Sequence, residues 1–306
     1  MASNNYNNYP MMLAERPAIC SLVPPGMPCH FSIAYPATLP VASRHHHHHH
    51  HQRPTFYDLD CPIRFGLPDP TKPMDLTTCA CLLASAQLMD NTKNELVDVT
   101  RPYTPISTNH QVGCFDLLIK DYGTKNGWLS KYLCEDLPIG GMVNFKHIDF
   151  NVKIPAPFRH KKIGMIAGGT GITPMIQALH AILGDGPKHQ QSSTDEVTLL
   201  YGSRNSDDIL GGSMLQKWAN EHTSKFKYVD VLSLEPSDSN YVGERGFIDR
   251  ERIVKYLPPA SNGEDVIIFV CGPPIMYELL CGPRNETEVT GLLGELGYSS
   301  NQVFKF

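Results

Sequence analysis

The feature that most constrains this fold is a short apolar run leading directly into a glycine-rich turn. Residues 163–167 are apolar, and Gly168-Gly169-Thr170-Gly171-Ile172-Thr173-Pro174 follows at once. Apolar residues then recur at helical spacing up to Leu183, which predicts a strand, a tight turn and a helix with Thr173 as its N-cap. Glycines let a backbone approach a pyrophosphate, and the first N–H groups of the helix point at it. A turn without any ligand is the alternative. No Gly-Lys-Ser/Thr follows, so a P-loop nucleotide hydrolase is not expected.

The surrounding residues, 159–306, alternate strands with helices. Apolar runs at 197–201, 228–232 and 266–270 predict further strands, and helices are expected from near Ser213 and after Asp249. This alternation implies a doubly wound parallel sheet with right-handed crossovers. Such a sheet binds ligands at the carboxyl ends of its strands.

Two segments are expected at that edge beside the glycine turn. Cys271-Gly272-Pro273-Pro274 closes the run at 266–270 and places a thiol there, although a buried Cys271 with a purely structural role is the alternative. Asp207 and Asp208 follow the run at 197–201 and could bond a ribose diol and repel a 2′-phosphate, or simply cap a helix. Arg204 argues the other way, since an arginine can pair with a 2′-phosphate.

The N-terminal half reads differently. Residues 56–158 hold short apolar runs broken by Pro, Gly and Asn, which predict an antiparallel barrel or sandwich. Residues 1–55 are expected to be a disordered or targeting leader, and the tract His45–His51 reads as a tag or low-complexity linker.

Charge and cysteine usage exclude several classes. The formal net charge is −5, which does not favour nucleic acid as a partner, and no apolar run is long enough to span a membrane. Nine cysteines form no CxxC pair, so neither a zinc site nor a disulfide framework is expected. Reduced thiols fit an intracellular protein, in the cytoplasm, on the endoplasmic reticulum or in a mitochondrion.

One further motif ends a predicted strand in the N-terminal half, Arg101-Pro102-Tyr103-Thr104-Pro105-Ile106-Ser107. An arginine offers paired hydrogen bonds to a pyrophosphate, and a tyrosine can stack on a flavin ring. A surface strand with two prolines is the alternative. With the glycine turn, Cys271-Gly272-Pro273-Pro274 and Gly127-Trp128-Leu129-Ser130, the motif occurs in an order that resembles the NADH-cytochrome b5 reductases of the ferredoxin–NADP reductase superfamily.

The resemblance covers roughly residues 62–306 and implies the fold, the cofactors FAD and NADH, and the site. It implies an FAD-binding barrel over 56–158 and an NAD-binding domain over 159–306. The FAD contacts it implies are Arg101, Pro102, Tyr103, Thr104, Ser107, Leu118, Lys120, Tyr122, Trp128, Leu129 and Ser130, with Lys120 on the adenosine-diphosphate side and Ser130 capping a short helix. The NADH contacts it implies are Gly169, Thr170, Gly171, Asp208, Cys271, Gly272 and Pro273. Cys271 over the nicotinamide and Thr173 beside the flavin are the expected catalytic residues.

The sequence departs from the family in the barrel. The family's opening strand is not evident, and residues 76–81 stand where its Gly-Gln-His run belongs, so the family histidine cannot be assigned to a residue of this sequence. The expected function is electron transfer from NADH through FAD to a haem protein such as cytochrome b5, by a monomer whose membrane association is left open. A quinone or other small acceptor, and a non-catalytic protein with a degenerate flavin site, are the alternatives. The stretch Lys153, Arg159, His160, Lys161 and Lys162 could dock an acidic haem protein or be an ordinary solvated segment.

Overall fold

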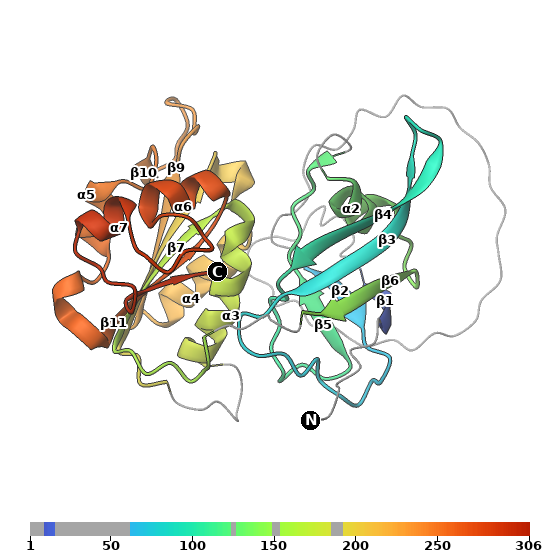
Figure 1. Ribbon diagram of the computed structural model, residues 1–306, viewed down its shortest axis with the longest axis horizontal. Helices are drawn as coiled ribbons and strands as arrows, with labels where there is room; N and C mark the ends of the chain where they lie inside the picture. The colour runs from blue at the N-terminus through green and yellow to red at the C-terminus, as the bar shows by residue number, and fades with distance from the viewer. Residues whose placement is uncertain (1–8, 16–61, 124–126, 149–153, 185–191) are drawn as a thin grey trace. The chain divides into compact units, whose positions relative to one another are not determined.

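The computed structural model describes residues 9–15, 62–123, 127–148, 154–184 and 192–306, which form one compact unit. It contains two six-stranded sheets, one in each of the halves expected from the sequence (Figure 1). The histidine tract and Lys153 lie outside the described residues. Within those ranges, no helix combines the length and the apolar composition that crossing a membrane requires.

The first sheet is antiparallel throughout, with strand order β4-β3-β6-β1-β2-β5. Its strands are β1 (Tyr9–Glu15), β2 (Ile63–Gly66), β3 (Leu82–Asp90), β4 (Glu95–Tyr103), β5 (Cys114–Leu117) and β6 (Met142–His147). A short helix, α2 (Trp128–Lys131), packs against β3 and β4 and runs on into a wider helical turn over Tyr132–Asp136.

All six strands bury side chains in one cluster. At its centre Phe65, Phe115 and Phe145 stack or meet edge to face, with ring centroids 5.0–5.5 Å apart. A sheet whose strands all contribute to one cluster must curl around it, so the barrel-like architecture expected from the sequence is confirmed.

Strand β1 lies where no strand was expected. Residues 1–55 are expected to form a leader with no opening strand, yet Tyr9–Met12 pairs with β6 and Met12–Glu15 pairs with β2. Met11 and Leu13 are buried in the barrel core. The expectation is therefore wrong for residues 9–15, because the missing strand is supplied from far upstream of β2.

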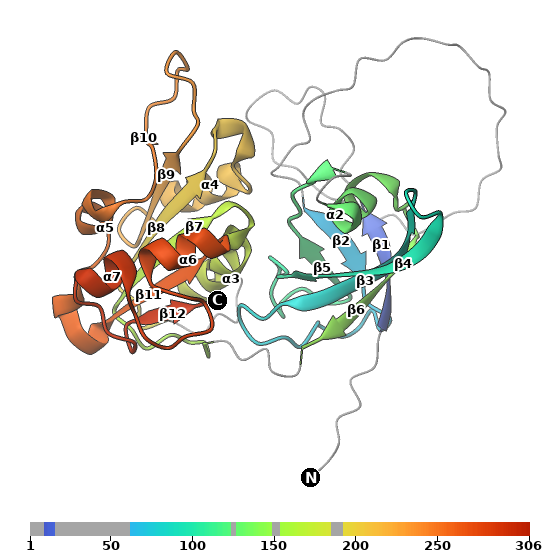
Figure 2. The ribbon, with the colours of Figure 1, turned by 45° about the horizontal axis from the view of Figure 1, so that its top comes forward.

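The second sheet is parallel, with strand order β10-β9-β8-β7-β11-β12. Its strands are β7 (Lys162–Gly168), β8 (Glu196–Ser203), β9 (Phe226–Leu232), β10 (Glu244–Arg245), β11 (Val266–Cys271) and β12 (Val303–Lys305). One face is covered by α3 (Ile172–Leu183) and α4 (Gly212–Glu221), and the other by α5 (Arg250–Tyr256), α6 (Pro274–Leu280) and α7 (Gly291–Glu295) (Figure 2). The doubly wound fold is confirmed.

The strand order fixes where a ligand can enter this sheet. From β7 the chain proceeds outward through β8, β9 and β10, and it then returns to the other side of β7 with β11 and β12. The order therefore reverses between β7 and β11, the position at which doubly wound sheets bind their ligands. The glycine turn follows β7, and Cys271 ends β11.

Candidate active site

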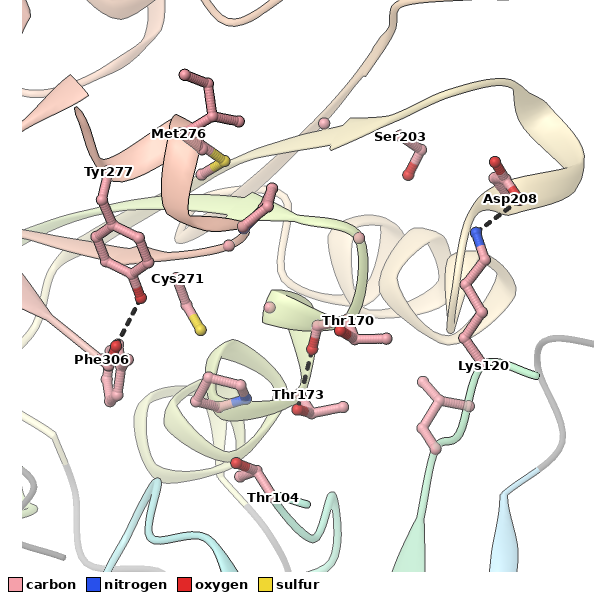
Figure 3. Close-up of a pocket in the computed structure, with 18 of the residues that line it drawn as sticks. Thr104, Lys120, Thr170, Thr173, Ser203, Asp208, Cys271, Met276, Tyr277 and Phe306 are labelled. Carbon is pink, nitrogen blue, oxygen red and sulfur yellow. Dashed lines mark hydrogen bonds and ion pairs between the residues drawn. The ribbon is translucent and has the colours of Figure 1, made fainter. Parts of the chain in front are cut away.

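A cavity of about 1020 Å³ opens at the carboxyl ends of β7, β8 and β11 (Figure 3). It is large enough for an extended cofactor and is lined from both halves of the unit. The predicted site residues that line it are Arg101, Pro102, Tyr103, Thr104, Leu118, Lys120, Tyr122, Leu129, Ser130, Gly169, Thr170, Gly171, Thr173, Asp208, Cys271, Gly272 and Pro273. Ser107 and Trp128 are the two predicted residues outside this lining.

Two positions of the turn after β7 require glycine, each for a different structural reason. Gly169 has a positive φ of 54°, and a Cβ built there would meet no atom within 4 Å, so its backbone faces open space at the cavity wall. A Cβ on Gly171 would instead lie 2.2 Å from the carbonyl oxygen of Cys271. The turn therefore exposes its backbone at one position and packs against the end of β11 at the other.

The predicted helix caps are wrong in detail. Helix α3 begins at Ile172 with Gly171 as N-cap, because a 3-10 turn over Gly169–Gly171 runs straight into it. Thr173 lies inside the first turn, where its Oγ1 donates to the Thr170 carbonyl at 3.2 Å. Ser130 likewise lies inside α2, whose N-cap is Gly127.

Ser130 joins α2 to the segment that follows β5. Its Oγ donates to the Gly127 carbonyl at 2.9 Å and accepts from the Tyr122 amide at 3.3 Å. Tyr122 Oη in turn lies 3.5 Å from Thr170 Oγ1 in the glycine turn. Local hydrogen bonds thus connect the two segments predicted to hold the two cofactors.

Strand β4 ends in the arginine and tyrosine of the first motif. The Arg101 side chain is exposed, and its Nη1 donates to the Thr100 carbonyl at 2.7 Å. A bond to a neutral carbonyl leaves the positive charge of the guanidinium available to an anion. Burial raises the pKa of the Tyr103 phenol, which therefore stays neutral and offers a flat, largely apolar ring to the cavity.

Three charged side chains meet at the β8 end of the cavity. Lys120 Nζ lies 2.6 Å from Asp208 Oδ1, and Arg204 bonds the same carboxylate through Nε and through Nη2, the latter at 3.2 Å. Burial works against the carboxylate charge, but these hydrogen bonds outweigh it, and the pKa of Asp208 is below its ordinary value. Lys120, expected beside FAD, here pairs with the residue expected to bind NADH.

Gln177 on α3 makes a connection that the sequence did not indicate. Its Oε1 accepts from the Cys79 amide at 2.5 Å, and its Nε2 donates to the Ser107 carbonyl at 3.0 Å. Cys79 is buried, has a positive φ of 64°, and donates its thiol to the Pro174 carbonyl at 3.2 Å. Residues 76–81, which replace the family's Gly-Gln-His run, are thereby held against α3, with Cys79 and Cys81 lining the cavity.

The chain's last residue also contributes to the cavity wall. Phe306 is buried, its amide donates to the Val270 carbonyl at 3.0 Å, and its carbonyl accepts from Tyr277 Oη at 2.6 Å. Figure 3 shows this pair beside Cys271. The sequence did not indicate the cavity residues at the end of β9, in the segment that follows it, or in α6, which are Val231, Ser233, Gly246, Phe247, Ile248, Ile275, Met276, Tyr277, Leu279 and Leu280.

These residues fit FAD and a nicotinamide dinucleotide. Gly169 leaves room for a pyrophosphate to approach the backbone closely. Helix α3 begins at Ile172, two residues after Thr170, so its first N–H groups could bind the same pyrophosphate. Arg101 supplies a cation on the side of the other half, and Tyr103 supplies a ring.

Comparison with known proteins gives the class and then the family. The sequence profile of the oxidoreductase FAD-binding domain matches residues 61–149, and that of the oxidoreductase NAD-binding domain matches residues 165–282. Fold, cavity and profiles together define an FAD-dependent, NAD-binding oxidoreductase. A protein of Aspergillus clavatus named NADH-cytochrome b5 reductase 2 is 39% identical over 232 residues, which are 73% of this chain and 67% of that protein. The chain belongs to the NADH-cytochrome b5 reductase family.

Further relatives agree with this assignment. A Neosartorya fischeri protein of the same name is 37% identical over 252 residues, covering 80% of this chain and 72% of that protein. Among solved structures, the cytochrome b5 reductase domain of Ulva prolifera nitrate reductase has a TM-score of 0.69 and 25% identity, covering 98% of this chain and 97% of that domain. The predicted family, enzyme class and cofactors are confirmed, and the alternatives of a small acceptor or a non-catalytic protein are not favoured.

Proposed function

We propose that this chain takes electrons in pairs from NADH through FAD and passes them singly to a haem protein of the cytochrome b5 type. The observation that carries the proposal is one cavity lined by Arg101 and Tyr103 from one half and by the glycine turn and Cys271 from the other. The names of the relatives support the acceptor. When bound, FAD supplies the change from two-electron to one-electron transfer.

The protein's part in this reaction is binding and orientation. Arg101 would hold the FAD pyrophosphate with paired, charge-assisted hydrogen bonds, and the neutral Tyr103 ring would lie against the flavin. Gly169 and the first N–H groups of α3 would hold the NADH pyrophosphate. Cys271 and Thr173, both lining the cavity between these sets, would align the two reacting rings, which is where most of the rate enhancement would come from.

The wall around Cys271 would limit the access of water. The rings of Phe269, Phe304 and Phe306 meet edge to face with centroids 4.9–6.2 Å apart, and Phe306 lines the cavity. The Tyr277 phenol, whose pKa is raised by burial, holds the Phe306 carbonyl in place. An apolar side chain such as Phe306 at this side of the cavity would favour stacked rings over hydrated ones.

The basic stretch before β7 offers little evidence for a surface on which an acidic haem protein would dock. Lys161 Nζ lies 3.9 Å from Asp195 Oδ2, and Lys162 Nζ lies 3.8 Å from Glu196 Oε2. Two positive charges of the basic stretch are therefore each paired with a neighbouring carboxylate. Burial and the nearby Arg159 lower the pKa of His160, which is therefore neutral near pH 7. The acceptor assignment thus depends on the relatives and on the experiment below.

The test uses the full chain loaded with FAD. Anaerobic addition of NADH should bleach the visible flavin absorption, and adding oxidised cytochrome b5 should then restore it as the haem is reduced. Cys271→Ser should slow the bleaching and leave the FAD content unchanged, whereas the control Cys114→Ser, a thiol outside the cavity lining, should behave like the parent.

Each result has a distinct meaning. A protein that binds no flavin or ignores NADH would contradict the proposal. A reduced flavin that transfers electrons to a quinone or ferric chelate and not to cytochrome b5 would overturn the acceptor alone.

A further inference from the structure

A group of hydrogen bonds, which we call the clasp, joins α3 to the antiparallel half. Gln177 Oε1 accepts from the Cys79 amide at 2.5 Å, and Gln177 Nε2 donates to the Ser107 carbonyl at 3.0 Å. The Cys79 thiol donates to the Pro174 carbonyl at 3.2 Å. Gln177 is only 5% exposed and lies outside the cavity lining, so any effect on the reaction passes through the segments that it holds.

Apolar contacts by themselves would not fix the position of α3. Cys79, Ile106 and Leu118 of the antiparallel half are buried in one cluster with the apolar face of α3. Burial of apolar surface is non-directional, so it attracts the two halves without setting their register. A hydrogen bond, in contrast, weakens steeply as its length and angle change. The clasp therefore determines where α3 lies against the antiparallel half.

The clasp is anchored to a well-braced part of the antiparallel half. Ser107 Oγ accepts from the Asp116 amide on β5 at 2.9 Å. The Asp116 carboxylate is only 11% exposed, and both of its oxygens accept from Arg64 on β2, at 2.7 and 2.9 Å. Strands β2 and β5 therefore hold the end of segment 101–107, which contains predicted flavin contacts.

On the other side, the clasp reaches the part of α3 that faces the cavity. Thr173 lines the cavity, and Gln177 lies one helical turn further along the same face of α3. Helix α3 continues directly from the 3-10 turn Gly169–Gly171, so a shift of the helix also moves the glycine turn. The position of α3 against segment 101–107 therefore sets the separation of the groups proposed to hold NADH and FAD.

The backbone of Cys79 supplies an independent observation. Cys79 has a φ of 64°, which non-glycine residues rarely adopt, and it is 1% exposed. Such a conformation persists only where surrounding contacts hold it, and it is concentrated at functional sites. Here the amide and the thiol of Cys79 both donate to α3. The strained residue thus belongs to the clasp.

We propose that Gln177, together with Cys79, is a positioning residue for hydride transfer, because the clasp sets the separation and offset of the nicotinamide and flavin rings. The inference rests on the proposed function, in which the antiparallel half holds FAD and the parallel half holds NADH. No bond of Gln177 or Cys79 forms or breaks in the reaction. NADH loses a hydride and is oxidised, and FAD gains that hydride and a proton and is reduced.

The test compares Gln177→Leu with a matched control, Gln302→Leu. Gln302 is also a buried glutamine, 7% exposed, and its Nε2 donates to the Ala260 and Gly263 carbonyls at 2.9 Å each, outside the cavity lining. Stopped-flow reduction by NADH is measured well below the melting temperature of each FAD-loaded variant.

For Gln177→Leu we expect a limiting reduction rate between about tenfold and 100-fold lower than in the parent. FAD content and the NADH concentration for half-maximal reduction should stay within about twofold of the parent, because the groups proposed to hold each cofactor remain. NADH deuterated at the transferred position should show a primary isotope effect on the lowered rate, since hydride transfer is the slowed step. Gln302→Leu should keep the parent's limiting rate.

Hydrogen exchange measured by mass spectrometry gives a readout that needs no turnover. In the FAD-loaded protein, the peptide containing Cys79 should exchange faster in Gln177→Leu than in the parent, and at the parent's rate in Gln302→Leu. Cys79→Ala removes the thiol bond and keeps both bonds of Gln177, so it should lower the limiting rate by a smaller factor. This milder variant decides the question if Gln177→Leu does not fold.

A limiting rate equal to the parent's in folded Gln177→Leu, or in Cys79→Ala where that variant decides, would overturn the inference. An equal loss of rate in Gln302→Leu, or a slower reduction that more NADH reverses, would overturn it as well. A parent whose flavin is not bleached by NADH contradicts the proposed function instead, and the exchange rate at Cys79 still shows whether Gln177 holds the two halves in register.

Discussion

Substituting Gly171 by alanine tests whether the contact between the glycine turn and β11 positions the reacting groups. The φ angle of Gly171 is −63°, so alanine meets no backbone strain there and the whole effect is steric. The added Cβ would lie 2.2 Å from the carbonyl oxygen of Cys271 and 2.9 Å from the amide nitrogen of Gly272. Both are backbone atoms, so no side-chain rotation relieves the clash.

The size of the effect follows from these distances. Real Cβ atoms essentially never come closer than 3.0 Å to such atoms, so the turn and the end of β11 must separate by roughly 0.8 Å. Overpacking of this kind costs about 1–3 kcal/mol, which lowers Tm by roughly 2–10 °C in a chain of this size. A displacement near 1 Å at a reacting group can lower a rate about 100-fold.

The assay is stopped-flow reduction of the bound flavin by NADH, together with a thermal melt and the FAD content. For Gly171→Ala we expect a limiting reduction rate about 100-fold lower with FAD retained, since Arg101 lies in the other half. The matched variant is Gly169→Ala, whose Cβ meets no atom within 4 Å but whose φ is positive. It should cost about 1 kcal/mol and raise the NADH concentration needed for half-maximal reduction, with the limiting rate preserved.

A Gly171→Ala variant that melts with the parent and reduces its flavin at the parent's rate would refute this reasoning. Equal kinetic losses in both variants would also refute it, because close packing explains the glycine at 171 and ligand access explains the glycine at 169.

Three further predictions follow from single contacts. Arg101→Ala should lower FAD content after gel filtration more than it lowers NADH affinity, and equal flavin content in variant and parent would contradict a phosphate role. Gln177→Leu removes the hydrogen bonds of this side chain to the Cys79 amide and the Ser107 carbonyl, so urea denaturation should show a loss of about 2–4 kcal/mol; a change below about 1 kcal/mol would mean that other partners replace both bonds. Burial raises the pKa of Asp230 to about 6 from 3.8, despite a hydrogen bond from Tyr228 that lowers it. Its neutral form therefore favours folding at low pH, and that contribution is lost as pH rises through about 6. Asp230→Asn should be about 2 kcal/mol more stable than the parent at about pH 8 and equal to it below about pH 4, whereas a pH-independent difference would refute the assignment.

The parallel half was predictable because its signals are local. The run 266–270 is apolar throughout, as expected for a buried parallel strand, and β11 spans Val266–Cys271. Asp249 caps α5 by accepting from the Arg252 amide. Strands β10 and β12 escaped prediction because two or three residues are too few to show a period.

The cavity was predictable only where a motif is continuous in sequence. The segments 101–104, 169–173 and 271–273 all reach it. The Lys120–Asp208 pair joins residues 88 positions apart, and the Gln177–Cys79 bond joins residues 98 positions apart. No local spacing encodes such contacts, since they depend on how the two halves pack.

Strand β1 shows how a weak local signal can decide a global property. Met11 and Leu13 are buried and Met12 between them is exposed, an alternation over three residues that is too short a pattern to recognise in a sequence. Yet in the order β4-β3-β6-β1-β2-β5 this strand is the sole hydrogen-bonded join between two groups of described strands. β4, which carries Arg101 and Tyr103, belongs to one group, and β5, which leads to Lys120, belongs to the other. Without β1, β6 and β2 would expose unpaired edges and the two parts of the flavin site would lose their common frame. The apparent gap in the barrel was the ground for a degenerate flavin site, and β1 removes it.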